Sequence, residues 1–87
     1  MDSADERLLL PGYKWIVYDP DLLGGKPTIR GTRLSVALIL EGLAQGMTPE
    51  QIAEDYPGFP VESIPDVLKF AAKQANTPLK RRVASGS

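Results

Sequence analysis

The sequence predicts a mainly α-helical fold, in which a small N-terminal β-strand or hairpin is followed by a three-helix unit of the helix-turn-helix type. A short run of aromatic and β-branched residues precedes a stretch rich in glycine and proline, and three helical patterns follow. Only Gly46 and Met47 separate the first two helical patterns, and so short a connection favours two helices that pack directly against each other. The chain of 87 residues is long enough for one domain with a thin core.

The N-terminal part is predicted to be a strand followed by a tight arch. Residues 15–18 are aromatic or β-branched, which is typical of a short strand, and residues 19–27 are rich in turn formers. Gly31 can adopt a positive φ between two extended pieces, residues 28–29 and residues 33–36. We assign structural roles in this arch, and at the end of the first helix, to Gly25, Pro27, Gly31, Thr32 and Gly46.

Cap residues define the first two helices. Ser35 is placed to cap a helix whose apolar residues recur at the spacing of one helical face: Val36, Ile39, Leu40 and Leu43. Gly46 supplies the left-handed conformation that ends this helix. Thr48 begins the second helix with a proline at the first helical position, and Gln51 can complete a capping box. The segment YPGFP then ends this short helix.

The third helix is predicted to begin near Ser63. Pro65 is tolerated only in a first helical turn, and Asp66 could complete a capping box with Ser63. One helical face would carry Ile64, Leu68, Ala71 and Ala75, and a neighbouring face would carry Val67 and Phe70. We expect the helix to stop at residues 77–78.

Composition excludes several kinds of catalytic and cofactor site. The chain has no histidine and no cysteine, so it lacks a Ser-His-Asp triad, a thiolate nucleophile and the usual ligands of zinc. Lys26 is followed by a proline, which has no N–H group to donate to a phosphate, so this segment is not a P-loop. Asp19 and Asp21 are typical of a turn rather than of a metal site. We therefore predict a protein that is not an enzyme and that holds no metal or cofactor.

We expect a cytoplasmic protein that does not bind membranes. Residues 1–10 carry three acidic side chains and only three consecutive leucines, which does not match a secretory signal. No apolar run approaches the length of a bilayer span. The absence of cysteine also suits a reducing compartment.

Charge is distributed in zones along the chain, although the formal net charge is only −1. Residues 24–40 contain no acid, residues 41–66 contain no base, and residues 67–87 again contain no acid. Such asymmetry favours surfaces for particular partners, although solvated surfaces without a function would give the same pattern. We divide the chain into a flexible N-terminus (1–12), a helix-turn-helix domain with an N-terminal β arm (13–76) and a basic C-terminal tail (77–87).

The segment GGKPTIRGTRLSV, followed by a helix, the segment GMTPEQIAEDYPGF and a third helix, resembles the domain-of-unknown-function family four-three-three. The shared signature consists of Gly25, Lys26, Pro27, Ile29, Arg30, Gly31, Thr32, Arg33, Gly46, Tyr56 and Pro57. Members of this family are regarded as VapB-like antitoxins of prokaryotic type II toxin–antitoxin pairs. The resemblance implies a winged or homeodomain-like helix-turn-helix, a toxin partner similar to PIN-domain ribonucleases, and binding to the operator of its own operon. The sequence departs from the pattern at Pro60 and Pro65, where a polar cap and a freely helical residue are expected.

Basic residues near the helices are the candidates for contacts with DNA phosphates. They are Lys26, Arg30, Arg33, Lys69 and Lys73. Arg30 and Arg33 could equally form structural ion pairs with acidic residues of the domain, namely Asp19, Asp21 or Glu41. The second helix is acidic, so we expect weak DNA binding by a single domain and stronger binding by a dimer with two half-sites.

Two protein interfaces are also predicted. A homodimer would cover apolar residues beyond one packed face, namely Trp15, Ile16, Val17, Tyr18, Val67 and Phe70. The tail would contact the carboxylate-rich active site of the toxin that the resemblance implies, through Leu79, Lys80, Arg81, Arg82 and Val83, unless it is only a solvated basic tail. We therefore predict an antitoxin that neutralises a PIN-like ribonuclease toxin and binds operator DNA as a dimer to repress its own operon. The alternative is a protein-interaction module with a helix-turn-helix fold that does not read DNA.

Overall fold

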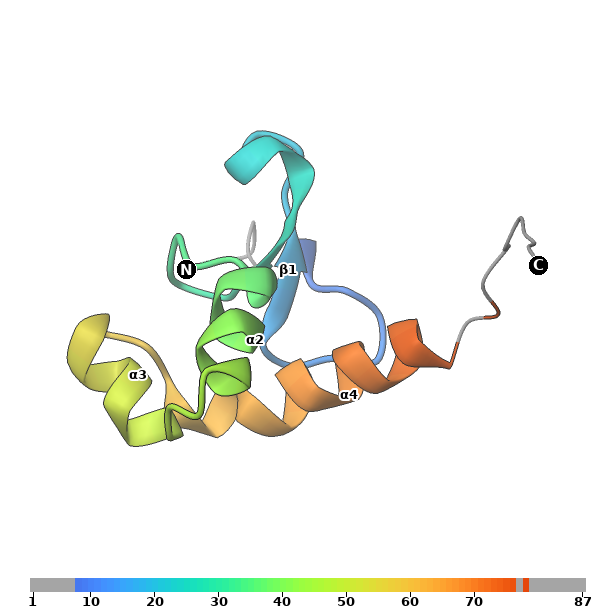
Figure 1. Cartoon of the computed structure of the whole chain (residues 1–87). Helices are drawn as coiled ribbons and strands as arrows, with labels where there is room; N and C mark the ends of the chain where they lie inside the picture. Colours follow the sequence, from blue (N-terminus) through green and yellow to red (C-terminus); the bar gives the residue numbers. More distant parts are fainter. Residues whose placement is uncertain (1–7, 77, 79–87) are drawn as a thin grey trace.

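The computed structural model describes residues 8–76 and residue 78. A short antiparallel hairpin of two strands is followed by three helices (Figure 1). The strands are β1 (Ile16–Tyr18) and β2 (Pro27–Ile29), and the helices are α2 (Val36–Ala44), α3 (Pro49–Asp55) and α4 (Ile64–Ala75). Short 3-10 turns, η1 (Leu23–Gly25) and η2 (Val61–Ser63), precede β2 and α4. The prediction of a small N-terminal hairpin followed by three helices is confirmed.

Both faces of the hairpin are buried. The register pairs Ile16 with Ile29, Val17 with Thr28, and Tyr18 with Pro27. Because side chains alternate between the faces of a strand, Ile16 and Ile29 point together into the core, where both are fully buried. Val17 and Thr28 lie on the opposite face and are also buried. The hairpin is therefore an internal part of the domain except at its Tyr18 end, which is exposed.

The folded unit begins earlier than the predicted boundary at residue 13. Leu9 forms an isolated antiparallel bridge with Val17, and the Leu10 N–H donates to the carbonyl of Ile16 over 2.8 Å. Leu10 also packs against the hydrophobic core. Residues 8–12 thus cover the outer edge of β1 and are not a free arm; the rest of the predicted N-terminal segment lies outside the described residues.

The predicted arch around Gly31 is present and follows β2 directly. Gly31 has a φ of +80°, and the Ile29 N–H donates to the carbonyl of Leu34 over 2.9 Å. The Thr32 hydroxyl donates to the Ile29 carbonyl over 2.8 Å and accepts the Leu34 N–H over 3.0 Å. These bonds use the hydroxyl donor and one of its two acceptor sites inside the arch, which gives Thr32 a structural role.

The caps predicted for α2 and α3 are confirmed. The Ser35 side chain accepts the Leu38 N–H over 3.0 Å at the start of α2. Gly46 has a φ of +90° just after this helix. Thr48 and Gln51 form the reciprocal capping box of α3, with bonds of 2.8 and 3.1 Å.

The capping box predicted for α4 is wrong. The Ser63 hydroxyl donates to the carbonyl of Pro60 over 2.7 Å and makes no cap bond to the helix. The η2 turn leads directly into α4, so Ser63 already has helical φ and ψ of −78° and −13°, whereas a capping side chain needs an extended backbone. Asp66 consequently does not pair with Ser63.

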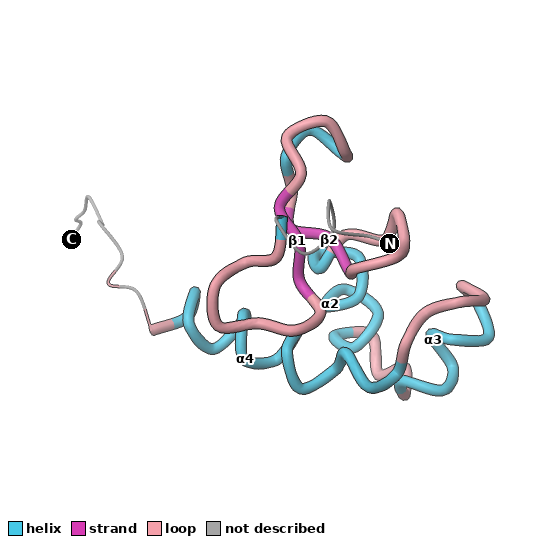
Figure 2. The backbone as a smooth tube through the Cα atoms, turned by 180° about the vertical axis from the view of Figure 1, so that it is seen from behind, coloured by secondary structure: helices cyan, strands magenta, loops and turns pink. Residues whose placement is uncertain are grey.

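The core is built around α2, which contacts β2, α3 and α4 (Figure 1). The buried apolar cluster consists of Ile16, Ile29, Val36, Ile39, Ile52, Phe59 and Val67. Figure 2 shows the same arrangement from behind, with the connection between β1 and β2 projecting away from α4. Within the part of the chain that the structure describes, no helix is long and apolar enough to cross a membrane.

The inward face of α4 includes Ile64, as predicted, but not Leu68. Val67 is fully buried in the core and Phe70 packs against it, whereas Leu68 is 50% exposed. A residue outside the helix covers this side of α4 as well, because the Tyr13 ring meets the Phe70 ring edge-on at a centroid distance of 6.1 Å.

This packing corrects the predicted dimer surface. Ile16, Val17 and Val67 are buried inside their own chain and have no apolar surface to offer a second copy. Of the six residues assigned to the dimer, only Tyr18 is classed as exposed, at 53%, while Trp15 and Phe70 are half-buried.

Candidate binding surfaces

The five basic residues assigned to DNA do not share one surface. Arg30 and Lys69 line a groove of about 980 Å³, together with Lys14 and residues of the N-terminal loop. Arg33 lines a different groove, and Lys73 lies with Lys69 near the end of α4. Lys26 lies between η1 and β2 and lines neither groove. The basic zones of the sequence are therefore distributed over several faces of the fold.

We call the first surface the aromatic–basic edge, made of Tyr13, Lys14, Trp15, Arg30 and Lys69. Arg30 follows β2 and Trp15 precedes β1, so they are the next cross-strand neighbours after Ile16 and Ile29. The Arg30 N–H donates to the Trp15 carbonyl over 2.8 Å, and the guanidinium lies 4.7 Å from the centroid of the Trp15 ring. Among the described residues, the structural partner of Arg30 is thus an aromatic ring and not the carboxylate considered from the sequence.

The loop that carries Trp15 is fastened to α4 by two side chains of that helix. Asp66 Oδ2 accepts the backbone N–H groups of Lys14 and Trp15 over 2.7 and 2.8 Å. Lys69 Nζ donates to the carbonyl of Gly12 over 2.5 Å and lies 4.6 Å from the centroid of the Tyr13 ring. These contacts fix the aromatic–basic edge in one conformation.

Sequence reasoning missed Tyr13 and Lys14 as members of this edge, and it missed Asp66 as the residue that holds their loop on α4. The two bonds of Asp66 join residues 51 and 52 positions apart, which no local pattern reveals. In the sequence, the only role indicated for Asp66 was the capping box with Ser63, and that role left no reason to expect a bond to residues 14 and 15.

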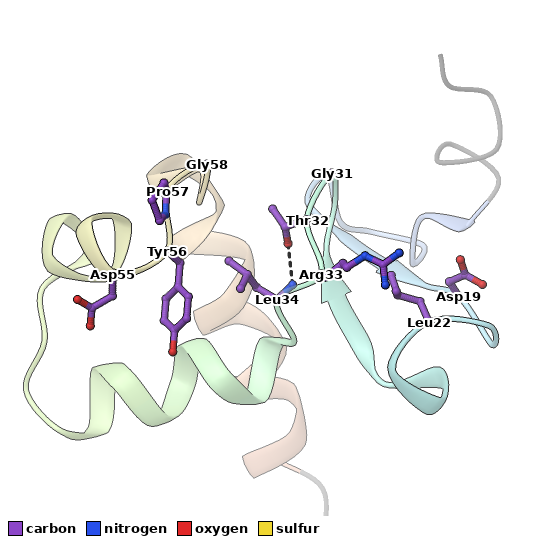
Figure 3. A pocket seen from close by; sticks show the side chains of 10 residues that line it. All are labelled: Asp19, Leu22, Gly31, Thr32, Arg33, Leu34, Asp55, Tyr56, Pro57 and Gly58. Atoms are coloured by element: carbon purple, nitrogen blue, oxygen red, sulfur yellow. Dashed lines mark hydrogen bonds between the residues drawn. The ribbon is translucent and has the colours of Figure 1, made fainter.

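The second surface, which we call the arch groove, has a volume of about 770 Å³. Residues 31–34 of the arch form one side and residues 55–58 form the other, while Asp19 and Leu22 close one end (Figure 3). In Figure 3, the Arg33 side chain points toward Asp19 and Leu22, and Asp55 lies at the far end beyond Tyr56. The groove therefore joins the two segments, GGKPTIRGTR and YPGF, that stand out in the sequence.

Two further assignments concern the metal site and the tail. Among residues 8–76 and 78, no group of three or more acidic side chains is placed to hold a metal ion. The residues assigned to toxin binding lie outside the described residues: Leu79, Lys80, Arg81, Arg82 and Val83.

Residues 16–71 match the family described as "Protein of unknown function (DUF433)". The chain belongs to this family. A relative of this DUF433 protein, "Uncharacterized protein y4eO" of Sinorhizobium fredii (strain NBRC 101917 / NGR234), is 36% identical to it over 66 residues. That match covers 74% of the DUF433 protein but 30% of the relative, so the chain spans less than a third of the relative's length. No solved structure matches the chain.

The range that matches DUF433 relates differently to the two surfaces. Every residue that lines the arch groove lies inside it. The aromatic–basic edge lies partly outside it, because Tyr13, Lys14 and Trp15 precede the matched range. The arch groove is thus built wholly from the part of the chain that defines the family.

Proposed function

We propose that this DUF433 protein is a cytoplasmic prokaryotic antitoxin, which neutralises a PIN-like ribonuclease toxin and binds operator DNA as a homodimer to repress its own operon. Three consecutive helices support a helix-turn-helix unit, because only residues 45–48 connect α2 to α3. The family resemblance supports the toxin as the partner. The function of a fold must be argued from a site, and here the site is the aromatic–basic edge.

The observation that carries DNA binding is the meeting of three cations from distant parts of the chain. Lys14, Arg30 and Lys69 line one groove beside two aromatic rings, and Lys73 lies one turn further along α4. Lysine and arginine side chains bind DNA mainly through the phosphates. Asp66 and Glu62 line the same groove and reduce its positive charge, which favours weak binding by one copy and stronger binding by two.

Fluorescence anisotropy with a labelled duplex from upstream of the protein's own reading frame tests this proposal. Arg30→Gln and Lys14→Gln should each lower the slope of log K against log salt by about 1, since each removes about one phosphate contact. Lys26→Gln is the matched control, because Lys26 lies outside the edge and should leave the slope nearly unchanged. Equal affinity for a scrambled duplex would contradict operator recognition, and unchanged slopes in both edge variants would contradict this placement of the phosphate contacts.

Toxin neutralisation is proposed to rest on the basic tail. Deleting residues 79–87 should abolish inhibition of the ribonuclease encoded beside this gene and leave the circular dichroism spectrum of the helices unchanged. A truncated protein that still inhibits with full potency would show that the folded domain carries the inhibition.

The proposed homodimer is tested by sedimentation at tens of micromolar. Since Ile16, Val17 and Val67 are buried, the contact would use the exposed Tyr18 and the accessible part of Trp15. A monomer at this concentration would remove the dimer and, with it, the two half-sites of the DNA proposal.

One observation favours the second candidate, an interaction module that does not read DNA. In the described part of the chain, α3 carries Glu50, Glu54 and Asp55, all exposed, and no basic residue. A helix with this charge would be repelled by phosphates if it were the one presented to DNA. Failure to bind any duplex, together with retained binding to the ribonuclease, would support this candidate.

A further inference from the structure

Two of the three cations that line the first groove already have a contact for their charged group within the fold. Arg30 lies over Trp15, and Lys69 binds Gly12 and lies over Tyr13. Arg33 is exposed and makes no hydrogen bond, ion pair or ring contact with any other described residue. Its guanidinium group, which lines the arch groove, therefore keeps all its N–H donors for a ligand.

The backbone that carries Arg33 is nevertheless held in place. Thr32 and Leu34, its neighbours on either side, are joined by the hydrogen bond drawn in Figure 3, and Thr32 is also bonded to Ile29. Leu34 packs against the core. A fixed backbone with an uncommitted planar guanidinium is well suited to a carboxylate, which arginine can bind through two parallel hydrogen bonds.

The middle of the arch groove is apolar and partly lined by bare backbone. Leu34 and Tyr56 are half-buried and pack against the core, so their exposed parts form a fixed apolar wall beside Pro57. Gly31 and Gly58 both have positive φ, and a Cβ atom at either position would meet nothing within 4 Å. Another main chain could thus approach the groove closely on both sides.

The charges in the groove disfavour a polyanion as its occupant. Asp19 and Asp55 line it together with Arg33, so two carboxylates face one cation. Asp19 lies at the Arg33 end and Asp55 at the opposite end (Figure 3). A phosphate chain long enough to fill the groove would meet both carboxylates, whereas a single carboxylate at Arg33 would face Asp19 alone, whose Oδ1 accepts the Asp21 N–H over 2.9 Å.

We propose that the arch groove binds an extended segment of a partner protein, in which one carboxylate pairs with Arg33 and an adjacent apolar side chain packs against Leu34, Tyr56 and Pro57. This site lies apart from the aromatic–basic edge and depends neither on DNA binding nor on the basic tail. It assigns a role to Arg33 other than the phosphate contact expected from the sequence.

Titration of the ¹⁵N-labelled full chain with the capped tripeptide acetyl-Leu-Glu-Leu-amide tests the proposal by NMR. At millimolar peptide, we expect shift changes confined to the amides of residues 31–34, Tyr56 and Gly58. Acetyl-Leu-Gln-Leu-amide should bind about tenfold more weakly, because it cannot form the charge-assisted pair with Arg33.

Arg33→Gln should lower the affinity for the glutamate peptide about tenfold and bring it to that of the glutamine peptide. Lys26→Gln removes an exposed cation outside the groove and should leave the affinity unchanged. The amide spectrum of each variant shows whether it is folded. The proposal is overturned if millimolar peptide shifts no groove amide, if both peptides bind equally, or if folded Arg33→Gln binds like the parent chain.

Discussion

Replacing Asp66 by alanine should destabilise the domain by about 2 kcal/mol, because it removes two charge-assisted hydrogen bonds at once. The Trp15 N–H is half-buried and would be left without its partner, which costs about 1.5 kcal/mol. The Lys14 N–H is exposed and can turn to water, so its bond contributes about 0.5 kcal/mol. In a domain of this size, the melting temperature should fall by about 8–16 °C.

Urea denaturation measures this loss with two probes. Far-UV circular dichroism reports the helices, and fluorescence reports Trp15, the single tryptophan, which lies beside the mutated contact. Asp66→Asn keeps an acceptor oxygen without the charge and should lose about half as much stability, about 1 kcal/mol. Glu62→Ala is the matched control, because Glu62 is exposed, lines the same groove and should change stability by less than about 0.5 kcal/mol.

If Asp66→Ala is as stable as Glu62→Ala, the two bonds do not stabilise the fold, and the argument that Asp66 fastens the N-terminal loop fails. The fastening of the loop by Asp66 would also be contradicted if circular dichroism were lost at a lower urea concentration than the one at which Trp15 fluorescence changes. The loop should separate from α4 no later than the helices melt.

Two further predictions concern the core and a helix cap. Ile39→Ala should cost about 2–5 kcal/mol in urea denaturation because Ile39 is fully buried, while Leu68→Ala should cost less than about 0.5 kcal/mol; a larger loss at Leu68 would contradict the observed inward face of α4. Thr48→Ala should cost about 1 kcal/mol, because it leaves the Gln51 N–H without its cap, and Glu50→Ala serves as the exposed control from the same helical turn; equal stability of the two variants would show that the capping box contributes nothing.

Local chemistry predicted the helices well, because caps act within a few residues. Ser35, Thr48 and Gly46 act as the sequence indicated, since each satisfies or redirects backbone groups of its own helix. The α4 face was harder to predict, because both Val67 and Leu68 belong to plausible apolar stripes. The segment packed against α4 decides between them, and that segment precedes it by more than fifty residues.

The candidate surfaces were also hard to predict, because they depend on contacts between distant segments of the chain. Composition and charge identified Arg30, Arg33 and Lys69 as candidates, but their separation into two grooves follows from the strand register and from the arch. The pairing of Arg30 with Trp15 depends on Ile29 lying opposite Ile16, which a three-residue strand does not specify by pattern alone. The arch groove needs residues 31–34 and 55–58 to meet, and only tertiary packing brings them together.

The fastening of residues 12–15 to α4 also has a consequence for how the chain folds. Contacts between residues so far apart in sequence are costly in entropy while the intervening chain is disordered, so we expect the hairpin and the helices to open as one cooperative unit. Amide protons of β1 and α4 should then exchange with solvent at the rate of global unfolding rather than by separate local openings. A fragment of residues 35–76 would lack the bonds of Asp66 to residues 14 and 15, and it would also lack the core residues Ile16 and Ile29. Ligands are therefore best sought with the entire chain.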